Sequence, residues 1–197
     1  MTQKVKILSR SKIYSHRYED IFSEKVLLQS GYEGEYIVSY TKEFVIVVPF
    51  LFSKDSILML SQYRYGIRKT VLGFPGGFLE NKETITDAAK RELFEETGYE
   101  TEKFEHITSL YENAGKSRNK FHIVFAYNVK FSNTPKQNPD IYESGTNLHI
   151  IPINQLLKLK YIIKLASAVT IAILPFIYLK VTNKSLINFF ILKNLKL

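Results

Sequence analysis

Apolar and polar segments alternate along the first half of the chain and predict a succession of β-strands. Residues 35–40 (EYIVSY) have the alternation typical of a strand, whereas residues 43–52 (EFVIVVPFLF) are almost continuously apolar, which predicts a buried strand. Residues 56–65 (SILMLSQYRY) follow the polar turn SKDS as a third strand. Beyond residue 100 the same patterns predict strands at 106–113, 121–131 and 148–153.

One segment between these strands has helical periodicity, with a start signal and a stop signal. Thr84 and Asp87 form a predicted capping box and Gly98 supplies a left-handed cap, so a helix is expected over residues 85–97. Residues three and four apart share one side of a helix, so the pattern separates an apolar stripe from an acidic one. The apolar stripe is Ile85, Ala89 and Leu93, and the acidic stripe is Glu92, Glu95 and Glu96.

The acidic stripe requires an explanation, because like charges at this spacing repel. Each such pair costs about 0.2–0.5 kcal/mol, and Lys90 and Arg91 offset only part of that cost. A divalent cation would offset the remainder, and carboxylates without Cys or His favour Mg²⁺ or Mn²⁺. The alternative is a solvated acidic helix face that binds no ligand.

A second helix is predicted over residues 154–174, and Pro175 is expected to end or kink it. Its apolar part, residues 165–179, is shorter than the roughly 20 residues that a membrane span requires. A buried helix is therefore expected, and no transmembrane segment. In the remaining tail, residues 181–197, basic and apolar residues alternate. The tail could pack on the globular domain, take part in a dimer interface or lie on a lipid surface.

Composition limits the class of protein. The 197 residues are 45% hydrophobic and 23% charged, which predicts one sizeable globular core. The absence of Cys excludes disulfides, thiolate catalysis and zinc fingers, and with no apolar signal segment at the start it predicts a cytoplasmic location. The positive excess lies in residues 116–197, where Asp140 and Glu143 are the only acids. Such a surface favours nucleic acid, an anionic membrane or phosphorylated small molecules, or is simply lysine-rich and solvated.

The acidic helix and the residues before it resemble the Nudix box at its fixed positions. These positions are Gly77, Glu83, Arg91-Glu92-Leu93, Glu95-Glu96 and Gly98-Tyr99, with Tyr99 where the family usually has an aliphatic residue. The elements SQYRY (61–65) and VLGFPGG (71–77) are similar to those of the ADP-ribose pyrophosphatase branch of the family. The resemblance implies an α/β fold, an α/β/α sandwich with a mixed β-sheet, and an N-terminal β-strand extension that in this branch exchanges across a homodimer.

The expected organisation has three parts. Residues 1–43 form the N-terminal strand extension, with possible exchange between the subunits of a homodimer. Residues 44–180 form the Nudix hydrolase domain, and residues 181–197 form the tail.

The resemblance also implies roles for single residues. Arg91 orients the box glutamates, and Glu83 supports the loop before the helix. Arg64, in the QYR element, either contacts a phosphate or is a surface strand residue, and Gly77 lets the backbone approach the substrate. Catalysis is assigned to Glu95 and Glu92 with Arg91, and the ligands of Mg²⁺ or Mn²⁺ are Glu92, Glu95, Glu96 and the backbone carbonyl of Gly76.

The loop after the box departs from the branch. YENAGKSRNK, residues 111–120, aligns with a loop whose acidic pair would fall on Arg118 and Asn119, so the carboxylate proposed there as base or metal ligand is absent. The general base is therefore expected among the box glutamates, with Glu112 and Glu143 as the alternatives.

The function expected from these features is hydrolysis of a phosphoanhydride by metal-activated water. The small-molecule substrate would be a nucleoside diphosphate linked to another group, with ADP-ribose or a related nucleotide sugar preferred. The alternatives are a non-catalytic nucleotide- or RNA-binding Nudix module and an RNA 5′ pyrophosphohydrolase. The basic second half suits both alternatives, but a pure binding module has no need of a complete metal site.

Overall fold

The structure is a computed structural model. It describes residues 5–51, 55–132, 146–156, 158 and 167–182. The elements, in chain order, are β1 (Lys6–Ser15), β2 (Glu19–Leu27), β3 (Glu33–Thr41), β4 (Phe44–Leu51), β5 (Ser56–Arg64), β6 (Lys69–Gly73), β7 (Gly76–Phe78), α1 (Ile85–Thr97), β8 (Tyr99–Glu100), β9 (Phe104–Tyr111), β10 (Lys120–Tyr127), β11 (Lys130–Phe131), β12 (Asn147–Pro152), α2 (Ile153–Leu156) and α4 (Ala168–Thr182).

The central sheet is mixed and has the strand order β12-β5-β4-β10-β9, with β6 paired to β5 and β7 paired to β4. Strands β4 and β10 run parallel, and the other pairs are antiparallel. β4 pairs with β5 only at Phe50 and Leu51, and near its start it pairs with β7 instead. The first half of β4 is therefore joined directly to the strand that leads into α1.

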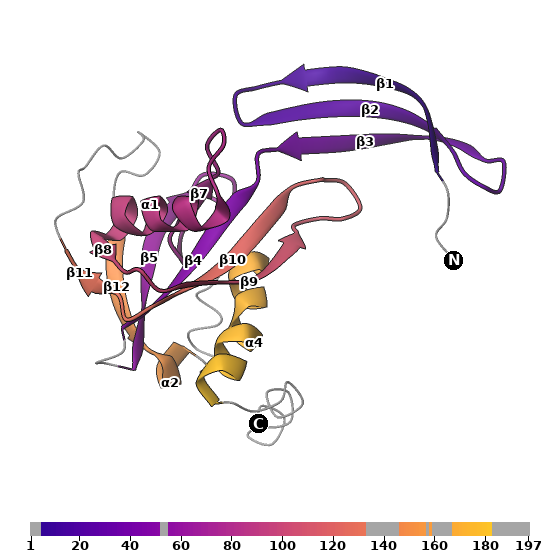
Figure 1. Ribbon diagram of the computed structural model, residues 1–197. Helices are drawn as coiled ribbons and strands as arrows, with labels where there is room; N and C mark the ends of the chain where they lie inside the picture. The colour runs from indigo at the N-terminus through magenta and orange to yellow at the C-terminus, as the bar shows by residue number, and fades with distance from the viewer. Residues whose placement is uncertain (1–4, 52–54, 133–145, 157, 159–166, 183–197) are drawn as a thin grey trace.

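Two helices cover opposite faces of this sheet (Figure 1). Alternate residues of β4 point to opposite faces, as in any strand. Ile46 and Val48 belong to a buried cluster that includes α4 residues, whereas Val45 and Val47 belong to a second cluster that includes Ala89 and Leu93 of α1. The expected α/β/α sandwich with a mixed sheet is thereby confirmed, and so is the continuous burial predicted for β4.

The predicted helix at 154–174 begins within one residue of α2, but it is wrong at its C-terminal end, and it is not continuous, because Lys158 is not helical. The short helix α2 ends at Leu156, and α4 begins at Ala168 and continues through Pro175 to Thr182. A proline inside a helix costs about 3 kcal/mol. Ile173, Leu174 and Ile177 are buried against the sheet, and each such side chain contributes about 1.5–3 kcal/mol, so packing outweighs that cost. No helix in the described ranges has the length and apolar character needed to cross a membrane.

The N-terminal strands β1, β2 and β3 form a separate antiparallel sheet that projects away from the central sheet (Figure 1). Its turn between β1 and β2 lies against β7, because the ring of Tyr18 stacks on Phe78 with centroids 5.9 Å apart. Phe78 in turn packs edge-on against Phe44 of β4. This row of rings anchors the turn beside the start of the central sheet.

The loop between β9 and β10 forms hydrogen bonds with the end of β3. The backbone N–H of Ser39 donates to the carbonyl of Lys116, and the N–H of Arg118 donates to the carbonyl of Ser39. The side-chain oxygen of Asn119 accepts from the N–H of Thr41 at 3.0 Å. The loop thereby fixes the backbone at the junction between the N-terminal sheet and β4.

Candidate active site

Helix α1 positions the acidic residues of the box. It begins after Thr84, whose hydroxyl accepts a hydrogen bond from the N–H of Asp87, and it ends at Gly98, which has a φ of 72°. A residue with a side chain is strained at that φ, whereas glycine is not. The predicted bounds, 85–97, and both caps are confirmed. Ala88, Ala89 and Leu93 are fully buried and fix the rotation of the helix about its axis.

Arg91 links the acidic residues of the box. Its guanidinium donates two hydrogen bonds to Glu83, through Nε at 2.9 Å and Nη2 at 3.0 Å. Nη1 donates to Glu92 at 2.6 Å and to Glu95 at 3.2 Å, and Nη2 also donates to the carbonyl of Phe78. Arg91 thus joins α1 to the loop and strand before it.

These hydrogen bonds shift the acidity of both partners. The two bonds from Arg91 hold the pKa of the Glu83 carboxyl below its usual value, against the opposing effect of burial. Glu83, followed by Glu92 and Glu95, raises the pKa of Arg91 above its ordinary value. Arg91 is therefore a permanent cation whose Nε, Nη1 and Nη2 all donate to Glu83, Glu92, Glu95 or the carbonyl of Phe78, an arrangement suited to a positioning residue.

Two glycines of β7 leave space that the site uses. A Cβ on Gly77 would lie 2.1 Å from Oε1 of Glu92, and a Cβ on Gly76 would lie 2.2 Å from the carbonyl oxygen of Val45. At Gly76 no side chain fits, because the blocking atoms are backbone, whereas a side chain at Gly77 would require the carboxylate of Glu92 to move. The N–H of Gly76 donates to Oε2 of Glu96 at 2.8 Å, so the start of β7 is joined to the box helix. The carboxylates of Glu92 and Glu96 are thereby placed against backbone.

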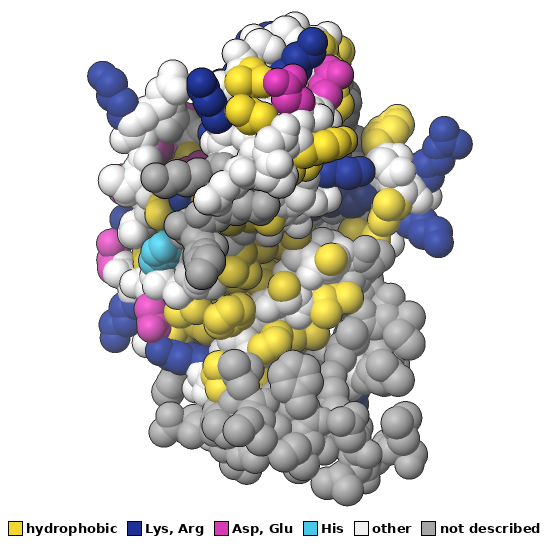
Figure 2. Space-filling model, turned by 90° about the vertical axis from the view of Figure 1, so that its right-hand side faces the viewer, with side chains coloured by type: hydrophobic (Ala, Val, Ile, Leu, Met, Phe, Trp, Pro, Cys, Tyr) yellow, Lys and Arg dark blue, Asp and Glu magenta, His cyan; other side chains and the backbone are white. Residues whose placement is uncertain are grey.

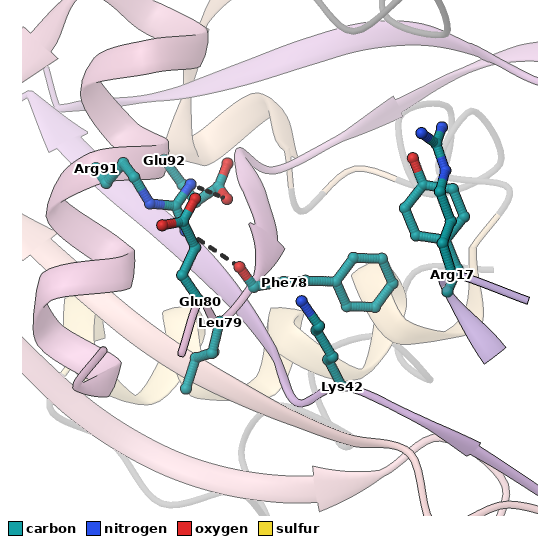
Figure 3. A pocket seen from close by; sticks show the side chains of 8 residues that line it. Arg17, Lys42, Phe78, Leu79, Glu80, Arg91 and Glu92 are labelled. Atoms are coloured by element: carbon teal, nitrogen blue, oxygen red, sulfur yellow. Dashed lines mark hydrogen bonds and ion pairs between the residues drawn. The ribbon is translucent and has the colours of Figure 1, made fainter. Parts of the chain in front are cut away.

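A cavity of about 370 Å³ opens beside these residues. Figure 3 shows Arg91 and Glu92 on α1 at one side, Arg17 at the other, and the ring of Phe78 and the side chain of Lys42 between them. The residues that line it are Arg17, Tyr18, Lys42, Phe78, Leu79, Glu80, Arg91 and Glu92.

The donor atoms of the box fit a hard divalent cation. Glu92, Glu95 and Glu96 offer only oxygen, which is the ligand that Mg²⁺ and Mn²⁺ prefer. The side chain of Glu95 is 57% exposed whereas that of Glu92 is 11% exposed. The carboxylates of α1 therefore extend from a buried position beside Gly77 to the solvent. In the described part of the chain no three acidic or histidine side chains already converge on one point, because Glu92 and Glu95 are paired with Arg91.

The other residues predicted for the site lie in different places. Arg64 is exposed at the end of β5 and is not among the residues that line the cavity. Glu112 is exposed on the loop after β9, where its Oε2 accepts a hydrogen bond from Asn119 at 3.4 Å. Glu143, the second alternative base, lies outside the described residues.

Sequence reasoning missed most of the residues that line the cavity. Arg17 and Tyr18 belong to the turn between β1 and β2, Lys42 lies between β3 and β4, and Phe78 ends β7. They belong to no motif, and only the long-range docking of the N-terminal sheet brings them together. The one available signal was Lys42, a lone cation directly before the most apolar strand.

Comparison with known proteins agrees with the box and the fold. The NUDIX domain model matches residues 42–168. The ADP-ribose pyrophosphatase of Bacillus subtilis (strain 168) is 30% identical over 121 residues, which cover 61% of this chain and 65% of that protein's length. The ADP-sugar pyrophosphatase of Mus musculus is 35% identical over 83 residues, 41% of this chain and 38% of that protein.

A solved structure, the crystal structure of an ADP compounds hydrolase, matches with a TM-score of 0.78 at 22% identity, over 91% of this chain and 96% of that one. At this identity the match supports the fold alone. The family model covers more than half of the chain and includes the glycines of β7, the Glu83–Arg91 pair and the acidic face of α1. On these grounds the chain belongs to the Nudix family.

Proposed function

We propose that this protein is a metal-dependent hydrolase that cleaves the phosphoanhydride of a nucleoside diphosphate linked to another group. ADP-ribose or a related nucleotide sugar is the preferred substrate. One observation carries the proposal: Glu92, which Arg91 joins to Glu95, lines a cavity that also contains cationic and aromatic side chains. Relatives named for the hydrolysis of ADP-ribose and of ADP-sugars support the choice of substrate.

Glu92, Glu95 and Glu96 would hold the metal, with the backbone carbonyl of Gly76 as a further ligand. A bound Mg²⁺ or Mn²⁺ would neutralise phosphate charge and lower the pKa of a coordinated water. Glu95 is the preferred proton acceptor, because it is the more exposed of the two α1 glutamates paired with Arg91. Water adds to one phosphorus, the bridging P–O bond breaks, and two monophosphates leave.

Replacement of single box carboxylates tests this proposal. Glu95→Gln and Glu96→Gln keep the size of the side chain and remove its charge, so turnover should fall by about 10²–10⁴-fold if the residue serves as base or ligand. Turnover is measured as phosphate release by a coupled phosphatase. The substrates are a panel of nucleoside diphosphate compounds, with Mg²⁺ or Mn²⁺ present. Glu102→Gln is a matched control, because Glu102 is exposed and forms an exposed ion pair with Lys90. Full turnover in excess chelator would refute the proposal.

The assembly proposed for this enzyme is a homodimer that uses the N-terminal sheet. All ten residues of β1 are exposed in the single chain. Exposed apolar side chains on β1 and β3 include Ile7, Ile13, Tyr14 and Ile37. Exposed apolar surface of this kind favours a protein partner. Figure 2 shows further hydrophobic side chains, gathered across the middle of the face of the molecule that it displays. A cytoplasmic location stays a prediction from the absence of Cys.

A further inference from the structure

Two cationic side chains reach the active-site cavity from outside the Nudix box. Arg17 comes from the turn between β1 and β2, and Lys42 comes from the segment between β3 and β4. Among the described residues neither side chain lies within ion-pair distance of a carboxylate. This distinguishes them from Arg91, which already pairs with three glutamates.

The backbone that carries Arg17 is held by aromatic packing. Tyr18 stacks on Phe78 at an interplanar angle of 22°, and the guanidinium of Arg17 lies 4.4 Å from the centre of the Tyr18 ring. The turn itself is closed by two backbone hydrogen bonds between His16 and Glu19. The side chain of Arg17 is thereby kept beside the cavity, although its tip is exposed to solvent.

The backbone that carries Lys42 is held on both sides. The N–H of Thr41 donates to the side chain of Asn119, and the carbonyl of Glu43 accepts from the N–H of Leu79. The side chain of Glu43 is engaged as well, since its Oε2 lies 3.0 Å from Nε2 of the buried His122. Lys42 therefore projects into the cavity from a fixed segment, and Asn119 acts as its positioning residue.

We propose that Arg17 and Lys42 form an anion-binding wall that holds phosphate oxygens of the substrate within the chain's own cavity, opposite the box carboxylates. The inference rests on the proposed function and extends it, because it assigns substrate binding to the N-terminal extension of the same subunit. The stacked rings of Tyr18 and Phe78 lie between the wall and the box and offer an apolar surface to the planar part of the substrate.

The distribution of charge around the cavity favours a phosphate as the ligand. On the α1 side the carboxylates outnumber the single guanidinium, so an anion there needs a metal to offset repulsion. On the opposite side two cations have no counter-charge among the described residues, and a guanidinium matches phosphate oxygens in pairs. The negative charge of a diphosphate bound between the two sides would be compensated by a metal ion on the α1 side and by Arg17 and Lys42 on the other side.

Binding without turnover tests the wall. Calorimetric titration with ADP-ribose in excess EDTA measures affinity while hydrolysis is prevented. Arg17→Gln and Lys42→Gln should each raise the dissociation constant about tenfold, which is the loss of affinity expected for one charge-assisted hydrogen bond. Arg17→Lys should lose less affinity than Arg17→Gln, because it keeps the charge but not the paired donors of the guanidinium. Lys103→Gln and Arg68→Gln, which change exposed cations away from the cavity, should stay within about twofold of the unaltered protein.

The outcomes separate the wall from the hydrolase proposal. If the unaltered protein binds neither ADP-ribose nor pyrophosphate in EDTA, or if both Gln variants bind like the controls, the wall is refuted even where Mg²⁺-dependent hydrolysis is found. If the variants lose affinity in EDTA but no metal restores turnover to the unaltered protein, the wall stands and the hydrolase proposal fails. In the active enzyme the same variants should raise KM and change kcat little.

Discussion

The side-chain oxygen of Asn119 accepts a hydrogen bond from the backbone N–H of Thr41, although the two residues are 78 positions apart. The amide nitrogen of Asn119 donates to Glu112, and its own N–H donates to the hydroxyl of Ser117. The resemblance to the ADP-ribose pyrophosphatase branch implies a loop carboxylate at the position of Asn119. Here the position stabilises the loop against β3 and holds Glu112 on that loop.

The general base should consequently be a box glutamate. Glu112→Gln and Glu143→Gln should each keep kcat within a few-fold of the unaltered enzyme, whereas loss of a general base costs about 10²–10⁴-fold. Full pH–rate profiles on the best substrate measure the effect, with Glu95→Gln and Asn119→Glu compared in parallel. If the Glu112 or Glu143 variant loses turnover but retains its metal affinity, that glutamate, and not a box glutamate, is the general base.

Gly77 should tolerate no side chain. In Gly77→Ala the new Cβ would lie 2.1 Å from Oε1 of Glu92, so the carboxylate must move away from its present position. Since a displacement of about 1 Å can cost about 10²-fold in rate, kcat should fall by that order while circular dichroism stays unchanged. Gly66→Ala is the matched control, because nothing lies within 4 Å of a Cβ there. Equal activity of the two variants would contradict the proposed role of Glu92.

The sequence was sufficient for the box helix because its determinants are local. Thr84 and Gly98 set the ends of α1, and the spacing of the glutamates places them on one side of it. Each signal acts within four residues, so no knowledge of the tertiary structure is needed. The burial of β4 was predictable for a similar reason, because it follows from a continuous run of apolar residues.

The cavity and the continuation of α4 beyond Pro175 could not be predicted, because both depend on contacts between distant segments. Arg17 reaches the site only because Tyr18 stacks on Phe78, 60 residues later in the chain. The helix α4 continues through Pro175 because Ile173 and Ile177 are buried against the sheet. The local rule for proline predicts that the helix ends or kinks at Pro175, because the rule does not include the burial of these residues.

The pair of Glu83 and Arg91 predicts an acid-dependent part of the stability. Because the folded pKa of Glu83 lies below its ordinary value of 4.5, its contribution is fully present above that pH and is lost as the pH falls through the folded pKa. The Tm difference between unaltered protein and Glu83→Gln should thus be constant near neutrality and shrink below about pH 4.5.

Thermal melts from pH 3 to pH 7 measure this difference. Glu102→Gln should show little difference at any pH, since an exposed ion pair contributes about 0–1 kcal/mol. A gap between unaltered protein and Glu83→Gln that stays constant through the acid range would show that Arg91 does not stabilise the charged form of Glu83.

The N-terminal sheet predicts a dimer whose formation depends on its exposed apolar residues. Ile13 and Ile37 are 55% and 53% exposed in the single chain, and in a dimer they are expected to be buried. Ile13→Glu and Ile37→Glu would place a charge in that interface, where an unpaired charge is strongly unfavourable. Light scattering at micromolar concentration should therefore find a dimer for the unaltered protein and monomers for these variants.

Two further measurements show whether the N-terminal sheet itself is responsible. Ile67→Glu changes an isoleucine of similar exposure, 49%, on the turn between β5 and β6, and it should remain dimeric. A shortened chain that begins near Thr41 loses β1, β2 and most of β3 together with Arg17, so it should lose both the dimer and its activity. A monomeric unaltered protein would refute the dimer but not the wall, because Arg17 and Lys42 line the cavity within a single chain.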